Sequence, residues 1–339
     1  MKKSVLFGAL AAAGLSAAAA SAATLDDVKA RGKLICGVNV GLTGFAAPDA
    51  NGVWNGFDIS LCRAIAAAIF SDPNAVEFTP LSGQTRFTAL ASGEVDVLAR
   101  NSTWSYSRDT DLKLDFVAVN YFDGQGFMVP KALGVTSAKE LDGATVCIQT
   151  GTTTELNLAD FFRVNNITYE PVPVENDAMA TQQYLAGACD SFTTDASGLA
   201  ATRATFEKPD EHIILPEIVS KEPLGPAVRH GDNAWGDLVR WTFFALVSAE
   251  ELGVTSANVD EMAKAPTNSP EINRLLGTEG EYGAMIGLGK DWAHQAIKAG
   301  GNYGEIFEKN IGENTPLGLA RGLNAQWKDG GLMYSPPFR

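Results

Sequence analysis

The sequence is poor in the residue types that build metal sites and activated nucleophiles. Its three histidines, His212, His230 and His294, are scattered along the chain, and its four cysteines include no C-x-x-C pair. Structural zinc sites need Cys and His ligands at short spacings, and nucleophilic catalysis needs a base beside the nucleophile. The sequence therefore favours neither a metal site nor a cofactor, and it shows no nucleophile–base pair.

Positive charge is also scarce. Lys and Arg total 26 against 40 Asp and Glu, so the formal net charge at pH 7 is −14. A chain this acidic repels phosphate backbones and anionic lipid surfaces. We therefore expect no binding of nucleic acid and no attachment to a membrane surface.

Long apolar runs are missing after the first residues of the chain. Residues 1–23 combine two lysines, Lys2 and Lys3, with an apolar, Ala-rich stretch at 5–20 and small residues at 20–23. This pattern is typical of a secretory signal peptide cleaved after Ala23, and the segment is short for its alternative, a membrane anchor. No Cys stands at the cleavage site to carry a lipid. We expect an exported, soluble protein that is not inserted in a membrane.

The rest of the chain alternates between strand and helix patterns. Each of two units has the order strand, helix, strand, helix, strand, which predicts a parallel sheet covered by helices. The first unit has strands at 33–40, 76–80 and 95–98 and helices at 57–70 and 86–92. The second has strands at 145–149, 168–174 and 189–194 and helices at 151–164 and 177–186.

Two segments rich in Gly or Pro, at 120–130 and 221–226, join these units. If both cross between the units, the first unit is made of two pieces and the crossings form a hinge. After residue 226 the chain is mostly helical, starting with a helix at 234–250, and we expect it to pack onto the first lobe. A third small domain is the alternative. The expected division is 1–23 signal peptide, 24–125 with 226–339 lobe 1, and 130–221 lobe 2.

The four cysteines suggest disulfides, because an exported protein folds in an oxidising compartment. Three pairings are possible. Sequence order favours Cys36–Cys62 and Cys147–Cys189, since each pair then stays within one lobe and leaves the hinge free to move.

Polar residues follow the strand at 95–98, where ligands of open parallel sheets bind. They are Asn101, Ser102 and Thr103, with Arg108 a few residues on. A guanidinium group binds a carboxylate with two parallel hydrogen bonds, so Arg108 is a candidate for that role. The alternative is a surface arginine paired with Asp109 or Asp111.

Two further candidates lie in the second unit. Thr152-x-x-Glu155 fits a capping box, and a helix N-terminus attracts anions, although a well-capped helix is the simpler interpretation. Asp195 follows a buried strand and could accept hydrogen bonds from an ammonium group. Its alternative role is to cap the next helix. Phe45, in the loop after the first strand, could wall a pocket or fill the core.

With these motifs the chain resembles the family-3 periplasmic solute-binding proteins of amino-acid ABC importers. The motifs are WNGFDI at 54–59, SGEVDV at 92–97, RD at 108–109, GTT at 151–153 and D-x-x-x-x-D at 190–195. Stretches such as RNSTWSYSRD, QTGTTTELNLADFF, IVSKEPLGPAVR and RLLGTEGEYG are similar to one subgroup. That subgroup contains the general L-amino-acid, or glutamate/glutamine/aspartate/asparagine, binding proteins.

The resemblance implies a two-lobed periplasmic-binding-protein fold of the α/β class. Each lobe would be a mainly parallel sheet covered by helices, joined to the other by a two-crossing hinge near 120–130 and 221–226, with a mostly helical C-terminal extension. It implies a monomeric periplasmic protein, without enzymatic activity, that closes on a free amino acid and delivers it to membrane permease subunits. A prephenate- or arogenate-type dehydratase on the same fold is the alternative, and a sensory ectodomain is a third reading.

The resemblance also implies roles for residues. Arg108 would bind the ligand carboxylate with Thr103 beside it, and Asp195 would bind the ammonium group. The loop at 149–153 would meet the carboxylate from the second lobe, and Phe45 would form the aromatic wall. The full set of predicted ligand-binding residues is Phe45, Arg100, Asn101, Ser102, Thr103, Arg108, Gln149, Gly151, Thr152, Thr153, Thr194 and Asp195.

Arg100 departs from the family pattern, which usually has a small residue there. Our hypothesis is that Arg100 meets a side-chain carboxylate or amide of the ligand and biases the site toward acidic and amide amino acids. The alternative is a structural ion pair with Asp96 or Asp115.

Overall fold

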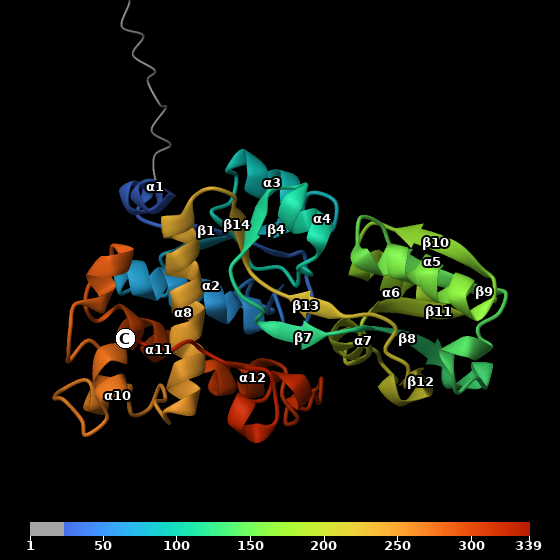
Figure 1. Ribbon diagram of the computed structural model, residues 1–339. Helices are drawn as coiled ribbons and strands as arrows, with labels where there is room; N and C mark the ends of the chain where they lie inside the picture. The colour runs from blue at the N-terminus through green and yellow to red at the C-terminus, as the bar shows by residue number, and fades with distance from the viewer. Residues whose placement is uncertain (1–23) are drawn as a thin grey trace, which may run out of the picture.

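A computed structural model describes residues 24–339. The predicted signal peptide lies outside the described residues. The chain forms two α/β lobes side by side, and a thin connection made of two strands joins them (Figure 1). Within residues 24–339, no helix is both long and apolar enough to cross a membrane, and no group of three or more His, Cys, Asp or Glu could hold a metal ion.

The first lobe is built on a five-stranded sheet with the order β4-β1-β5-β14-β6. Strand β1 runs parallel to β4 and β5, whereas β14 runs antiparallel to β5 and β6. The strands are β1 (Leu34–Asn39), β4 (Val76–Leu81), β5 (Val97–Leu98), β6 (Leu114–Phe116) and β14 (Ala227–Arg229). The helices are α1 (Thr24–Arg31), α2 (Phe57–Phe70), α3 (Arg86–Ser92) and α4 (Tyr106–Thr110), and a short hairpin pairs β2 (Ala47–Pro48) with β3 (Trp54–Asn55).

The second lobe repeats this plan with the order β10-β9-β11-β8-β12. Here β9 runs parallel to β10 and β11, and β8 runs antiparallel to β11 and β12. The strands are β8 (Gln125–Pro130), β9 (Ala144–Gln149), β10 (Tyr169–Val174), β11 (Ser191–Asp195) and β12 (His212–Ile214). The helices are α5 (Thr153–Asn165), α6 (Asp177–Leu185) and α7 (Ala196–Arg203), with short 3-10 turns η1 (Lys131–Leu133), η2 (Ala138–Glu140) and η3 (Pro209–Glu211).

The two crossings between the lobes pair with each other. Strand β7 (Tyr121–Asp123) runs antiparallel to β13 (Glu222–Leu224), so that Glu222 lies opposite Asp123. The ribbon between the lobes consists of these two strands (Figure 1). In each lobe, the strand that arrives from the hinge, β8 or β14, enters the sheet antiparallel to its neighbours. These strands make both sheets mixed rather than wholly parallel.

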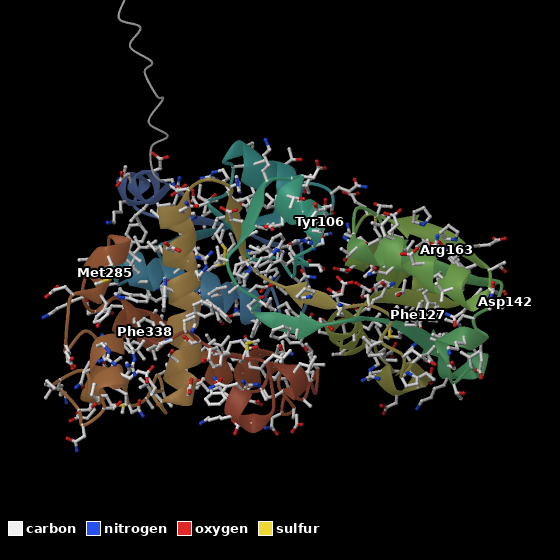
Figure 2. All side chains as sticks on the ribbon, viewed as in Figure 1. Tyr106, Phe127, Asp142, Arg163, Met285 and Phe338 are labelled. Atoms are coloured by element: carbon white, nitrogen blue, oxygen red, sulfur yellow. A yellow bond between two sulfur atoms is a disulfide. The ribbon has the colours of Figure 1, made fainter. Side chains whose placement is uncertain are left out.

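The C-terminal part packs onto the first lobe. Helix α11 lies against α2, and one hydrophobic core extends from Val28 near the N-terminus to Phe338 near the C-terminus. Figure 2 shows Phe338 among these C-terminal helices. The helices are α8 (Asn233–Glu251), α9 (Val259–Met262), α10 (Pro270–Leu275), α11 (Trp292–Gly300) and α12 (Tyr303–Asn310), with 3-10 turns η4 (Tyr282–Ile286), η5 (Gly322–Asn324) and η6 (Trp327–Asp329).

Each lobe contains one disulfide. Cys36 on β1 is joined to Cys62 on α2, and Cys147 on β9 is joined to Cys189 just before β11. Their Cα atoms are 6.3 and 5.6 Å apart, within the usual range. Neither disulfide crosses the hinge, so both are compatible with relative motion of the lobes. We propose the lobe boundaries expected above, 24–125 with 226–339 and 130–221. Strand β8 begins in the first hinge segment and pairs with β11 in the sheet of the second lobe.

Candidate functional site

A small polar cavity lies between the two lobes. The first lobe contributes residues that follow β4 and β5, and the second contributes residues that follow β9 and β11. The cavity therefore lies beyond the carboxyl ends of the parallel strands in both sheets, where ligands of such sheets bind. Its lining residues are Arg86, Arg100, Asn101, Thr103, Gln149, Thr152, Thr153, Thr154, Thr194 and Asp195.

Arg108 is a buried cation beside this cavity, not a surface residue. Only 6% of it is exposed, its Nη1 donates to the carbonyl oxygen of Thr103 at 3.0 Å, and its guanidinium lies 4.9 Å from the ring centre of Phe87. Burial lowers the pKa of Arg108 to about 10, although nearby Glu222 and Asp195 oppose the shift. Within residues 24–339 it forms no ion pair with Asp109 or Asp111, so the surface-pair alternative is wrong.

Asp195 ends β11 and stands at the first capping position of α7, but its side chain makes no capping hydrogen bond. Asp123 caps α7 instead, because its carboxylate accepts from the backbone N–H and the hydroxyl of Ser197. The Asp195 carboxylate is therefore left for another cation. Burial raises its pKa well above the usual range, and the negative charges of Asp123 and Glu222 add to the shift.

Arg100 lies in the cavity wall with spare hydrogen-bonding capacity. Its Nε donates to the carbonyl oxygen of Leu81 at 3.0 Å, whereas its buried Nη2 has no partner within residues 24–339. The structural ion pairs considered above are not formed. Asp96 pairs with Arg31, and Asp115 pairs with His230 at 2.7 Å. An unpaired buried donor is unfavourable, so Arg100 is ready to bind a ligand acceptor.

Arg86 is a cavity residue that we did not predict. It begins α3 after β4, and its Nη1 donates to the hydroxyl of Ser102 at 3.1 Å. Its buried Nε has no partner within the described residues. Burial lowers its pKa well below the usual value, and the positive charges of Arg100 and Arg108 lower it further. The rule that placed Asn101 beyond a strand end could have found Arg86, because it too follows a parallel strand.

The second lobe presents a row of threonine hydroxyls. Thr152 caps α5 by accepting from the backbone N–H of Glu155 at 3.4 Å, so the capped-helix interpretation is correct. Its hydroxyl also donates to the carbonyl oxygen of Gln149 at 2.7 Å. Gly151, with a φ of +73°, turns the chain into the helix but does not line the cavity.

Besides Gly151 and Arg108, two further predicted residues do not line the cavity. Ser102 is fully buried, and its hydroxyl donates to the carbonyl oxygen of Arg100 at 2.9 Å. Phe45 is 1% exposed and packs edge-on against Phe57 and Tyr121, with ring centres 6.0 and 5.6 Å away. The tight turn before the β2–β3 hairpin directs Phe45 into the core. Its predicted place in the cavity wall is therefore wrong.

Glu222, a hinge residue that we also missed, is 1% exposed and accepts hydrogen bonds from residues of both lobes. Its Oε2 accepts from the hydroxyl of Thr103 in the first lobe. It also accepts from the hydroxyl of Thr153 in the second lobe, at 2.8 Å. The lobes also touch directly, because the Gln84 side-chain amide donates to the Thr150 hydroxyl at 2.7 Å. The described arrangement of the lobes is thus a closed one.

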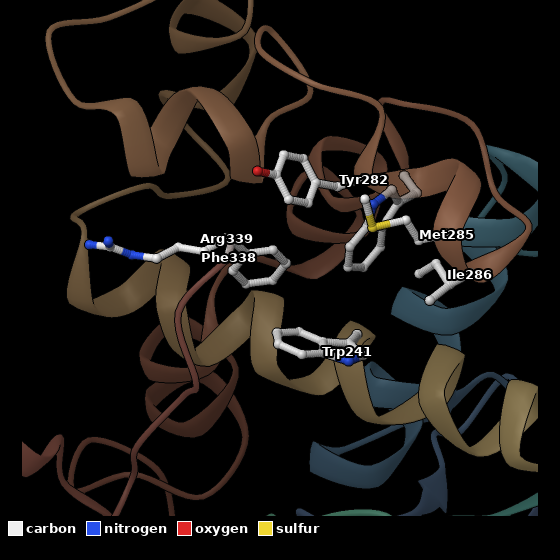
Figure 3. A pocket seen from close by; sticks show the side chains of 7 residues that line it. Trp241, Tyr282, Met285, Ile286, Phe338 and Arg339 are labelled. Carbon is white, nitrogen blue, oxygen red and sulfur yellow. The ribbon is translucent and has the colours of Figure 1, made fainter.

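A second cavity lies in the C-terminal extension and has a mostly apolar lining. Trp241 on α8 faces Tyr282, Met285 and Ile286, and Phe338 closes one side (Figure 3). It contains no buried pair of opposite charges. The interlobe cavity is therefore the better candidate for a charged small molecule.

Comparison with known proteins places the chain in a family. The family model described as bacterial extracellular solute-binding proteins, family 3, matches residues 34–258. The chain belongs to this family. It is 69% identical over 339 residues, covering all of both chains, to the glutamate/glutamine/aspartate/asparagine-binding protein BztA of Rhodobacter capsulatus. It is 58% identical, again over the full length of both, to the general L-amino acid-binding periplasmic protein AapJ of Rhizobium johnstonii.

A solved structure shows the same arrangement of elements. The periplasmic binding protein of an ABC transporter from Brucella ovis, with glutathione bound, is 57% identical to this chain. Its TM-score is 0.91, with 94% of this chain and 100% of that one covered. These relatives confirm the predicted two-lobed binding-protein fold, and they identify this family-3 chain as a binding protein rather than an enzyme. The dehydratase alternative is not supported.

Proposed function

We propose that this protein binds free L-amino acids in the interlobe cavity, with a preference for acidic and amide side chains, for an ABC importer. The observation that carries this proposal is the opposite charge of the two cavity walls. Arg108 beside Thr103 in the first lobe suits an α-carboxylate, and Asp195 in the second suits an α-ammonium group. Charged groups in a closed, dry cavity bind more strongly than the same groups in water.

The ligand side chain would meet Arg100 and Arg86. Both residues are 2% exposed, and each guanidinium group keeps one nitrogen without a partner among the described residues. A carboxylate or amide oxygen satisfies such nitrogens, whereas an aliphatic side chain leaves them unpaired. The names of BztA and AapJ, a glutamate-group binder and a general amino-acid binder, agree with this preference. Glutathione, seen in the Brucella ovis relative, ends in a glutamyl group with a free α-ammonium and α-carboxylate.

The same relatives support export to the periplasm and delivery to permease subunits. We propose that residues 1–23 are removed and that the mature protein is a periplasmic monomer. The backbone N of Thr24 lies 2.8 Å from Oδ2 of Asp232, and Thr24 is 4% exposed. A new amino terminus at this position would form an ion pair with Asp232.

Calorimetric titration of ligand-stripped mature protein tests the proposal. We expect L-glutamate, L-glutamine, L-aspartate and L-asparagine to bind more tightly than L-leucine. Arg100→Ala should narrow this difference by about tenfold, because a charge-assisted hydrogen bond contributes roughly 1.5–3 kcal/mol. No binding of any amino acid would refute the proposal, and an unchanged glutamate-to-leucine ratio in Arg100→Ala would refute the role of Arg100.

A further inference from the structure

Glu222 is a buried carboxylate in the hinge that accepts hydrogen bonds from both lobes. The resemblance to binding proteins assigns it no role, and it lies outside the lining of the cavity. Its two oxygens accept four hydrogen bonds from side chains of three separate segments. The donors are Thr103 from the first lobe, Thr153 and Asn157 from the second, and Ser220 from the crossing segment.

The backbone around Glu222 is fixed to the first lobe. The N–H of Trp104 donates to the carbonyl oxygen of Pro223 at 2.8 Å, and the N–H of Gly225 donates to that of Ser102 at 3.0 Å. These bonds flank Thr103, whose hydroxyl donates to the Glu222 carboxylate. The carboxylate and the Arg108 loop of the first lobe therefore form one unit.

The remaining contacts depend on the second lobe. Thr153 is the first residue of α5, and Asn157 is one turn further along. Asn157 donates from Nδ2 to Oε1 of Glu222 at 2.7 Å. The positive end of a helix dipole also stabilises a carboxylate placed there. Moving α5 away from the first lobe would break both hydrogen bonds and leave the buried charge of Glu222 underpaired.

We infer that Glu222 is a latch: a positioning residue that holds the lobes closed by binding the N-terminal turns of α5, and so slows ligand release. Ligand leaves only after the lobes open, and opening must break the bonds from Thr153 and Asn157. The latch acts on closure and not on the ligand side chain, so it affects all ligands equally. It rests on the proposed function only for the choice of amino acids as test ligands.

The test compares Asn157→Leu and Glu222→Gln with wild type in the full mature protein. Asn157 is outside the binding machinery, so its replacement removes a latch contact alone. Asn165→Leu on the same helix is the matched control, because the Asn165 amide donates within α5 to the carbonyl oxygen of Phe161 at 2.8 Å. The dissociation rates of L-glutamate and L-glutamine are measured by chase in stopped flow. Small-angle scattering measures the radius of gyration without ligand.

We expect both variants to release both amino acids about tenfold faster and to be more expanded without ligand, while Asn165→Leu matches wild type. The inference is overturned if Asn157→Leu keeps the wild-type rates and radius, or if only one of the two ligands is released faster. If Glu222→Gln does not fold, Asn157→Leu still decides. If wild type binds no amino acid, the proposed function fails, whereas the scattering comparison still tests the latch.

Discussion

The two lobes have the same sheet plan but opposite charges at the cleft. Each central sheet has three parallel strands and a strand from the hinge that enters antiparallel. At the cleft, the first lobe presents the guanidinium groups of Arg86, Arg100 and Arg108, whereas the second presents Asp195 and threonine hydroxyls. The repeated sheet plan therefore determines where a ligand binds. The residues that follow the strands determine which ligand binds.

The largest change in affinity is expected when the main cation of the first lobe is removed. Arg108→Gln should weaken glutamate binding at least 100-fold, because loss of one partner of a buried charge pair costs about 3 kcal/mol or more. Isothermal titration measures the change. Arg163→Gln, at an exposed position of the second lobe (Figure 2), is the control and should bind as wild type does. A loss below tenfold would contradict the assigned carboxylate site.

The second change removes the anion of the second lobe. Asp195→Asn keeps the shape but not the charge, and should weaken binding roughly 30-fold, about 2 kcal/mol. An amino acid whose α-ammonium is replaced by hydrogen should bind wild type and Asp195→Asn with similar affinity. If the variant discriminates against that analogue as strongly as wild type does, Asp195 does not hold the ammonium group.

Lowering the pH should weaken ligand binding by Asp195 of the second lobe before it affects binding by the arginines of the first lobe. Burial, Asp123, Glu222 and Asp177 raise the pKa of Asp195, and Arg86 opposes them. Ligand binding requires the charged form, so affinity should fall by up to tenfold per pH unit below that pKa. Titration between pH 8 and about 5 measures this. Asp123→Asn keeps a capping oxygen for α7 and should shift the loss to lower pH; an unchanged profile would contradict the coupling.

Protonation of these buried carboxylates should weaken ligand binding but stabilise the folded protein. Burial raises the pKa of Asp123 to about 6, despite hydrogen bonds from Ser197 and Gly124 that lower it. The folded protein therefore binds a proton that the unfolded chain lacks between pH 6 and its ordinary pKa near 4. This group's contribution to the ligand-free free energy of unfolding should rise as the pH falls from 7 toward 5, and chemical denaturation measures it.

The smallest expected effect concerns the end of the first lobe far from the cleft. Asp232→Asn should lower the free energy of unfolding of the mature protein by about 1 kcal/mol, since it weakens the pair with the amino terminus at Thr24. Burial opposes the hydrogen bonds to Asp232, yet its pKa is lowered. Thermal unfolding measures the change, and glutamate affinity should stay the same. No loss of stability would argue against a charged terminus at this position.

Most of the fold could be predicted from local sequence patterns. The helices at 57–70 and 86–92 have the predicted bounds, because apolar spacing is a local property. The antiparallel strands from the hinge were not predicted, since their pairing is between distant segments. Phe45 was misjudged because burial of an aromatic depends on how its loop turns.

The candidate site was harder to predict from the sequence than the fold. Arg108 and Asp195 each had a plausible structural role, and only their surroundings show which applies. The capping function expected of Asp195 belongs to Asp123, which is 72 positions earlier in the chain. Glu222 has no local signal, because its partners come from both lobes. Residues whose role depends on three segments at once cannot be recognised from a pattern in one.

The return of β14 to the first sheet has a consequence for folding during export. The second lobe is continuous in sequence and carries its own disulfide, so its contacts can form as soon as residue 221 has emerged. The first lobe has a strand missing from between β5 and β6 until residues 227–229 arrive. Long-range pairing of this kind is slow to form. The lobe that supplies the arginines should therefore be the last to become resistant to proteases, although its residues 24–125 leave the membrane before the second lobe does.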